Sequence, residues 1–183
     1  MKKIIVSFVA LTLVSSAFAQ KRYFTKTGVI SFRAGTAVED IDGINKSATT
    51  VFDASTGQIE FALLVKSFEF KSALMQEHFN ENYMESDKFP KSTFKGTITN
   101  ISKVNFQADG SYPVTVKGTI EIHGIKKEVE TTGLFKISGE SIVSTAEFTV
   151  TLEDFKIDIP SLVKDKISRT ATIKVNSTYA VLK

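Results

Sequence analysis

The chain has 183 residues, a formal net charge of +3, 15 phenylalanines, no tryptophan and no cysteine. Without cysteine it can have no disulfide framework, no thiolate nucleophile and no thiolate metal site. Its charged residues are interspersed, so it has no clustered basic footprint for nucleic-acid binding, and we expect no nucleic-acid partner.

The first nineteen residues have the pattern of a secretory signal peptide. Lys2 and Lys3 precede an apolar run over 4–14, and 17–19 form the small-x-small motif Ala-Phe-Ala. We expect cleavage after Ala19, one periplasmic or otherwise extracytoplasmic domain over 20–183, and no stable membrane span after cleavage. A retained N-terminal anchor is the alternative, although the apolar run is short for a bilayer.

Most of the remaining chain alternates apolar and polar residues with a period of two, which is typical of strands with one dry and one wet face. The segment 112–123 is the clearest, with Val116 and Ile120 on its dry face. Strands are predicted over 29–34, 49–53, 58–66, 93–100, 112–123, 128–137, 142–152 and 170–181. The stretch 35–46 is expected to be a loop with Asp42-Gly43 as a turn, and 154–163 to be irregular because Pro160 disfavours a central strand.

The segment 71–86 has no period of two. Met75, Phe79 and Tyr83 recur at a spacing of four, which predicts a short amphipathic helical element with Ser72 as its N-cap. Phe89-Pro90 should end it. Such an element could be a lid over a barrel mouth or a permanent plug, and the pattern does not distinguish these.

About eight antiparallel strands with one dry face each can stack as a sandwich or close into a barrel. Gly96, Gly118 and Gly133 lie on the predicted dry faces, where they could leave a cavity or mark bulges and bends. The phenylalanines on these faces could likewise form a filled core or line a tunnel for an apolar chain.

The two histidines are the main candidates for chemistry. His78 has Glu77 beside it and Glu81 three residues on, but two ligands do not make a metal site. His123 is expected on a wet face at a strand end. Structural roles are favoured for both, and no serine nucleophile motif is present, so we expect no catalysis, no metal and no cofactor.

Three segments together resemble the YceI-like polyisoprenoid-binding family of exported bacterial proteins. They are HFNENYMESDKFPKSTFKG (78–96), VKGTIEIHGIKKEV (116–129) and FTVTLEDFKIDIPSLVKDKISRTATIKV (148–175), and the opening TGVISFRAGT also fits. The resemblance implies an all-β, lipocalin-like antiparallel barrel of about eight strands. It also implies a long apolar pocket for a polyisoprenoid or similar amphiphile and an extracytoplasmic location, and it does not imply an enzyme.

We therefore expect a β-barrel with a short helical element at one opening, which binds an apolar ligand without catalysis. The candidate lining residues are Phe32, Phe52, Phe61, Val65, Met75, Phe79, Phe94, Ile98, Val116, Ile120, Phe135, Phe148, Val150, Ile173 and Val175. Candidates for a polar head group are Tyr112, Thr131, Ser177 and Tyr179. The alternatives are a cell-envelope accessory protein whose barrel is filled by its own side chains, and a lipid-modifying hydrolase or isomerase.

Overall fold

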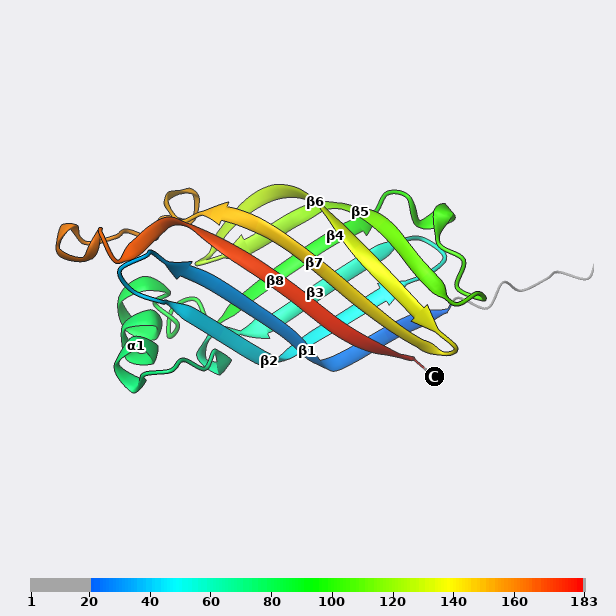
Figure 1. The fold of residues 1–183 in the computed structure, drawn as a ribbon, viewed down its shortest axis with the longest axis horizontal. Helices are drawn as coiled ribbons and strands as arrows, with labels where there is room; N and C mark the ends of the chain where they lie inside the picture. The colour runs from blue at the N-terminus through cyan, green and yellow to red at the C-terminus, as the bar shows by residue number, and fades with distance from the viewer. Residues whose placement is uncertain (1–20, 183) are drawn as a thin grey trace, which may run out of the picture.

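Eight antiparallel strands close into a barrel in the computed structural model, which describes residues 21–182 (Figure 1). Each strand pairs with its neighbours in the chain, and β8 pairs with β1 to complete the closure. The strands are β1 (Arg22–Gly35), β2 (Asp42–Asp53), β3 (Gln58–Leu64), β4 (Lys91–Ile98), β5 (Gly110–Ile122), β6 (Ile125–Ser138), β7 (Ser141–Thr151) and β8 (Ile167–Val181). The predicted lipocalin-like barrel is confirmed, whereas the expected signal peptide, residues 1–19, lies outside the described residues.

The β5–β6 hairpin contains the segment in which apolar and polar residues alternate most clearly. The two strands pair without a break from Gly110 opposite Ile137 to Ile122 opposite Ile125. The two residues between them, His123-Gly124, have φ angles of 52° and 71°. Two consecutive residues with positive φ make the tight turn whose twist matches antiparallel strands. The strand therefore ends at His123-Gly124, as the sequence predicts.

The first hairpin differs from the prediction. The expected loop over 35–46 is too long, because β2 begins at Asp42 and the predicted turn Asp42-Gly43 is strand. Arg33 pairs with Asp42 across the hairpin, and the Arg33 Nε donates to Asp42 Oδ1 at 2.9 Å. Gly43 faces Phe32, and a Cβ on it would lie 2.5 Å from the Phe32 ring. Glycine at this position leaves space for the Phe32 ring and does not form a turn, so the prediction of a turn at Asp42-Gly43 is wrong.

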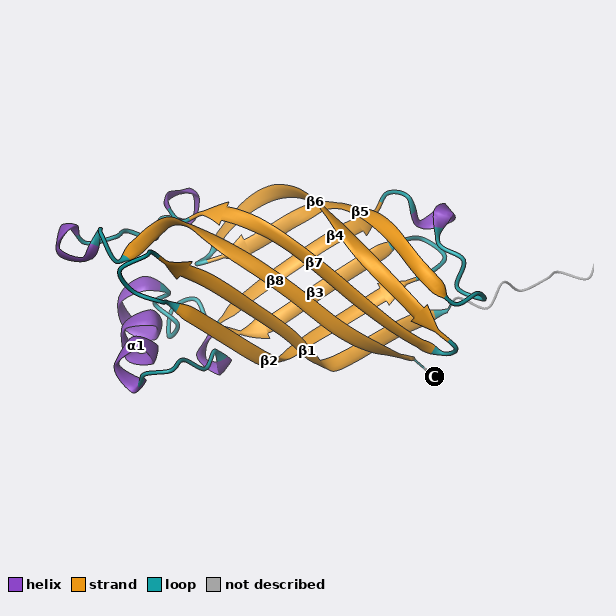
Figure 2. Cartoon of the chain, viewed as in Figure 1, coloured by secondary structure: helices purple, strands orange, loops and turns teal. Residues whose placement is uncertain are grey.

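The predicted helical element is present between β3 and β4. It consists of α1 (Ala73–His78), which continues as the π-helical turn η2 (Phe79–Tyr83). Ser72 is at the N-cap position, but its side chain makes no capping hydrogen bond. The helix ends before the predicted Phe89-Pro90 stop. The remaining helical turns, drawn in purple in Figure 2, are η1 (Val65–Ser67), η3 (Ile101–Lys103), η4 (Glu153–Phe155) and η5 (Ser161–Val163).

The barrel flares toward the end that carries α1. Residues 49–52 of β2 pair with 59–62 of β3, and 133–138 of β6 pair with 141–146 of β7. Both paired runs adjoin the turns at the end with the C-terminus, and the strands of each hairpin diverge toward α1 (Figure 1). The diverging ends leave the barrel wider on the α1 side.

The narrow end is filled by the protein's own side chains. The Phe52 ring is fully buried and stacks on Tyr23 with ring centroids 4.8 Å apart. Tyr179 and Phe135 approach the same ring at 4.9 and 5.2 Å. We call this end, built around Tyr23, Phe52, Ile98, Phe135 and Tyr179, the packed half, and the α1 end the flared half.

Candidate functional site: an apolar cavity in the flared half

The flared half encloses a cavity of about 520 Å³. That volume is within the range of small-molecule binding sites, roughly 300–1,000 Å³. Val114, Gly133 and Phe135 lie at its floor, where the packed half begins. Val163 and Lys166 lie at its mouth. The barrel is therefore neither hollow throughout nor filled throughout.

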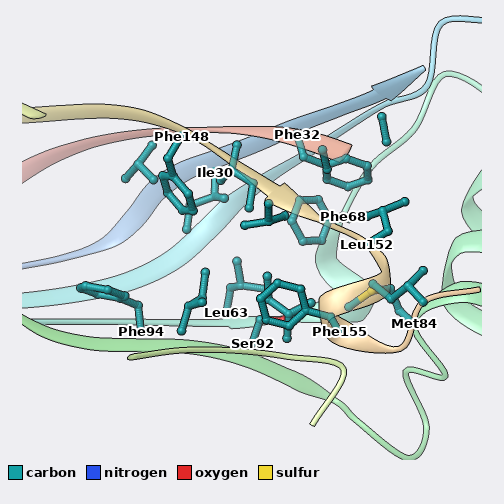
Figure 3. A pocket seen from close by; sticks show the side chains of 18 of the residues that line it. Ile30, Phe32, Leu63, Phe68, Met84, Ser92, Phe94, Phe148, Leu152 and Phe155 are labelled. Atoms are coloured by element: carbon teal, nitrogen blue, oxygen red, sulfur yellow. The ribbon is translucent and has the colours of Figure 1, made fainter. Parts of the chain in front are cut away.

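Side chains from strands and loops converge on this cavity (Figure 3). Strand residues form its inner wall, including Ile30 of β1, Phe94 of β4 and Phe148 of β7. Met84 and Phe155 come from the segments that follow η2 and β7, and they enclose the cavity nearer the mouth. The surface offered to a ligand is thus mainly hydrocarbon.

Most of the predicted lining residues lie on the cavity wall. They are Phe32, Phe61, Met75, Phe79, Phe94, Val116, Ile120, Phe135, Phe148, Val150, Ile173 and Val175. They share the dry face of a strand or the inner side of the helical element. The alternation that predicted them reports which way a side chain points, and in a closed barrel one of those directions is the interior.

Three predicted lining residues lie elsewhere. Phe52 and Ile98 are buried in the packed half and are not among the residues that line the cavity. Val65 is fully buried in η1, in the cluster that contains Met84 and Phe155. Alternation gives the face of a residue but not its depth along the barrel, so it could not separate these three from the wall.

The four head-group candidates are also separated by depth. Thr131 lies on the wall, with Oγ1 3.3 Å from the Glu147 carbonyl oxygen to which it donates. Tyr112 donates its hydroxyl to the Ala108 carbonyl at 3.1 Å, outside the cavity lining. Ser177 and Tyr179 are buried beneath the floor, and Tyr179 lies 3.1 Å from the hydroxyl of Ser144, a lining residue.

Two of the three dry-face glycines have a role in packing. Gly96 and Gly118 are directly opposite each other on β4 and β5, and neither lines the cavity. The Phe94 ring lies over both, so that an added Cβ would be 2.5 Å from the ring at Gly96 and 2.8 Å at Gly118. Only Gly133 borders the cavity. The interpretation of these glycines as sources of empty space is therefore wrong for Gly96 and Gly118.

Several wall residues were missed because they lie in segments without a period. They include Ile41, Phe68, Phe70, Met84, Phe155, Ile157 and Val163. Phe79 of η2 packs against Phe68 and Phe70, with ring centroids 5.4 and 4.9 Å apart. The only signal in the sequence was the presence of apolar side chains in stretches that otherwise read as loops.

The mouth carries the charged groups of the site. Among the described residues that line the cavity, the acidic and basic side chains are Glu39 and Lys166, and these pair with each other at 3.1 Å. Val38, Leu74 and Leu162 are exposed on the loops and helix at this end. The rim is therefore partly apolar, and charge is kept away from the floor.

The histidines lie apart from each other. His78 borders the mouth and is exposed. His123 is buried, contrary to the expected wet face, because its Nδ1 lies 3.0 Å from the Phe155 carbonyl and its ring meets Phe89 edge-on at 4.7 Å. It thereby fastens the β5–β6 turn to η4.

Within residues 21–182, no three acidic or histidine side chains are grouped as metal ligands would be. None of the helices in that part of the chain has the length and hydropathy to span a bilayer.

Comparison with known proteins identifies the family. The model of the YceI-like domain matches residues 23–179. The chain belongs to the YceI-like family. No curated protein sequence matches this YceI-like chain closely enough to count as a relative.

Solved structures show the same fold. A polyisoprenoid-binding domain from Saccharophagus degradans, implicated in plant cell wall breakdown, is 12% identical, with a TM-score of 0.76 over 89% of this chain and 99% of that domain. BcnA of Burkholderia cenocepacia is 16% identical, with a TM-score of 0.68 over 84% of this chain and 96% of BcnA. A Campylobacter jejuni YceI protein variant is 14% identical, with a TM-score of 0.57 over 100% of this chain and 99% of that one.

Proposed function

We propose that this YceI-like protein binds an apolar molecule, a polyisoprenoid or another lipid, in the flared half of its barrel. The observation that carries the proposal is the cavity of about 520 Å³ with its hydrocarbon wall. The driving force is the transfer of apolar area from water, about 25 cal/mol per Å². The polyisoprenoid-binding domain of similar fold gives this proposal independent support.

The packed half limits how a ligand can enter. The floor at Phe135 and Val114 is backed by buried aromatic rings, so a chain cannot thread through to the C-terminal end. A molecule longer than the cavity would extend past α1 and the loop that carries Lys166. The alternative of a barrel filled by its own side chains describes the packed half. The flared half has a cavity that a ligand can occupy. Both interpretations of α1, a lid over the mouth and a permanent plug, stay predictions.

We propose binding without catalysis. The chain has no cysteine, and the exposed His78 is the histidine that borders the cavity. The other histidine, His123, is buried away from the cavity lining, with Nδ1 3.0 Å from the Phe155 carbonyl oxygen and Nε2 3.9 Å from Glu85 Oε1. His78→Ala should therefore leave ligand affinity within about twofold, while loss of any detected turnover in this variant would favour the hydrolase alternative.

We also propose that the protein works outside the cytoplasm, because its first nineteen residues have the composition of a signal peptide. A carrier there would shield a water-insoluble molecule between membranes or enzymes. N-terminal sequencing of the protein from a cell-envelope fraction should begin at Gln20. An intact N-terminus in the cytoplasmic fraction would contradict the proposal.

Displacement of a fluorescent apolar probe tests the function directly. N-phenyl-1-naphthylamine should gain fluorescence in the delipidated protein, and a polyprenol should displace it with a stoichiometry of one. Absence of probe binding, or binding that the polyprenol does not compete with, would show that the cavity does not accept such ligands.

A further inference from the structure

Four hydroxyl groups gather at the boundary between the two halves of the barrel. They belong to Thr50 of β2, Ser144 of β7, and Ser177 and Tyr179 of β8, and their exposed fractions are 0%, 7%, 1% and 3%. Ser144 lines the cavity, and its Oγ lies 3.1 Å from the Tyr179 hydroxyl. We call these four residues the hydroxyl cluster.

The hydroxyl cluster is not internally satisfied. Thr50 Oγ1 and Ser177 Oγ are buried without a hydrogen-bond partner, although both lie near enough to Tyr179 to influence its pKa. Gly28 comes so close that a Cβ on it would be 2.9 Å from Ser177 Oγ. Neither Thr50 nor Ser177 lines the cavity, so the hydroxyl cluster meets a bound molecule through Ser144.

The hydroxyl cluster stays uncharged and can be arranged as a chain of donors. Burial raises the pKa of Tyr179 to about 12, against the opposing effect of Ser144, Ser177 and Thr50, so that its proton is held at physiological pH. If Thr50 or Ser177 donates to Tyr179, and Tyr179 donates to Ser144, the Ser144 proton is left for the cavity. The chain thus presents a donor to whatever occupies the floor.

A charged group would be poorly accommodated there. The acidic and basic side chains among the described lining residues, Glu39 and Lys166, are at the mouth and pair with each other. A carboxylate or phosphate at the floor would lose its hydration without gaining a counter-charge, which is very unfavourable. An uncharged oxygen loses far less and gains the Ser144 hydrogen bond.

We propose that the hydroxyl cluster binds the uncharged, hydrogen-bond-accepting end of the ligand, such as an alcohol or carbonyl oxygen. The ligand then enters polar end first, and its hydrocarbon fills the cavity toward the mouth. This inference rests on the proposed function, and it adds the head-group chemistry and the orientation of the bound molecule.

Competition against N-phenyl-1-naphthylamine with tetradecanol, tetradecane and tetradecanoate tests the inference. The wild-type protein should bind the alcohol about three- to tenfold more tightly than the alkane, as one net hydrogen bond provides. Ser144→Ala should abolish this preference and leave the alkane affinity unchanged. Thr149→Val, which removes a hydroxyl from the outer face of the same strand, should keep it.

Three results would overturn the inference while leaving the binding function intact. The first is equal affinity of the wild-type protein for the alcohol and the alkane, and the second is an equal loss of affinity for both ligands in Ser144→Ala. The third is a crystal structure of the alcohol complex in which the alcohol oxygen lies at the mouth or a water is bound to the hydroxyl cluster. Failure of all three ligands to displace the probe would instead contradict the proposed function. Thermal unfolding of each variant verifies that it is folded.

Discussion

The two halves of the barrel should respond differently when a phenylalanine is truncated to alanine. Phe52 is fully buried in the packed half, where Tyr23 and Tyr179 lie within 4.9 Å of its ring centroid. Phe148 is half-buried on the cavity wall. Both substitutions remove the same atoms from the dry face of a strand, so the comparison isolates what surrounds the ring.

The magnitudes follow from that difference. Truncating a phenylalanine in a packed interior costs about 3–5 kcal/mol, because lost transfer energy is joined by the cost of a new cavity. Phe148 already faces empty space on one side and has fewer partner atoms to lose, so we expect a loss of about 1–2 kcal/mol. At about 2–4 °C per kcal/mol, Phe52→Ala should lower Tm by roughly 6–20 °C and Phe148→Ala by roughly 2–8 °C.

Urea unfolding and calorimetry of delipidated protein would measure both losses, with mass spectrometry to verify that no lipid remains. Equal losses of unfolding free energy for Phe52→Ala and Phe148→Ala would refute the reasoning. Such a result would mean that the flared half is packed as tightly as the other half.

Three further predictions concern the cavity wall, the buried Tyr179 and the β5–β6 turn. Ala146→Phe should weaken binding of a long-chain ligand, because displacing three methylene groups costs about 2.4 kcal/mol, or about 50-fold in Kd. The control Thr149→Phe, on the outer face of the same strand, should leave the Kd within about twofold. Equal Kd values for the two variants would contradict this prediction. The pKa of Tyr179 is raised from 10.0 to about 12, so the folded state holds this proton more tightly than the unfolded state. The resulting stability is present below about pH 10 and is lost as the pH rises toward about 12. Tyr179→Phe should lessen the alkaline fall in unfolding free energy measured with urea, and an unchanged slope would count against a buried, protonated tyrosine. Gly124→Ala should lower unfolding free energy by at least about 1 kcal/mol, because Gly124 has a φ of 71° and a Cβ would be 2.5 Å from the Phe89 ring; an unchanged Tm would show that the turn can relax.

The direction of side chains was predictable from the sequence, because a strand alternates its faces locally. Val116, Ile120 and Phe148 were expected to face the interior, and all three lie on the cavity wall. Their depth was not predictable. Phe52 and Phe61 lie on the same hairpin, yet one is in the packed half and the other borders the cavity, since depth depends on how all eight strands tilt and pair.

The segments between strands were the least predictable part of the site. Phe68, Met84 and Phe155 enclose the cavity from stretches that have no period and whose positions are set by contacts far along the chain. His123 illustrates the same limit. Its burial depends on the Phe155 carbonyl, 32 residues away in sequence, and no local pattern reveals that contact.

Native mass spectrometry of the protein purified without detergent from its source tests the central claim most directly. We expect a fraction of molecules heavier than the polypeptide by the mass of one lipid, identified after extraction as a long-chain molecule with an uncharged polar end. Exclusively unliganded protein, both as isolated and after incubation with polyprenols, would contradict a binding function for the flared half.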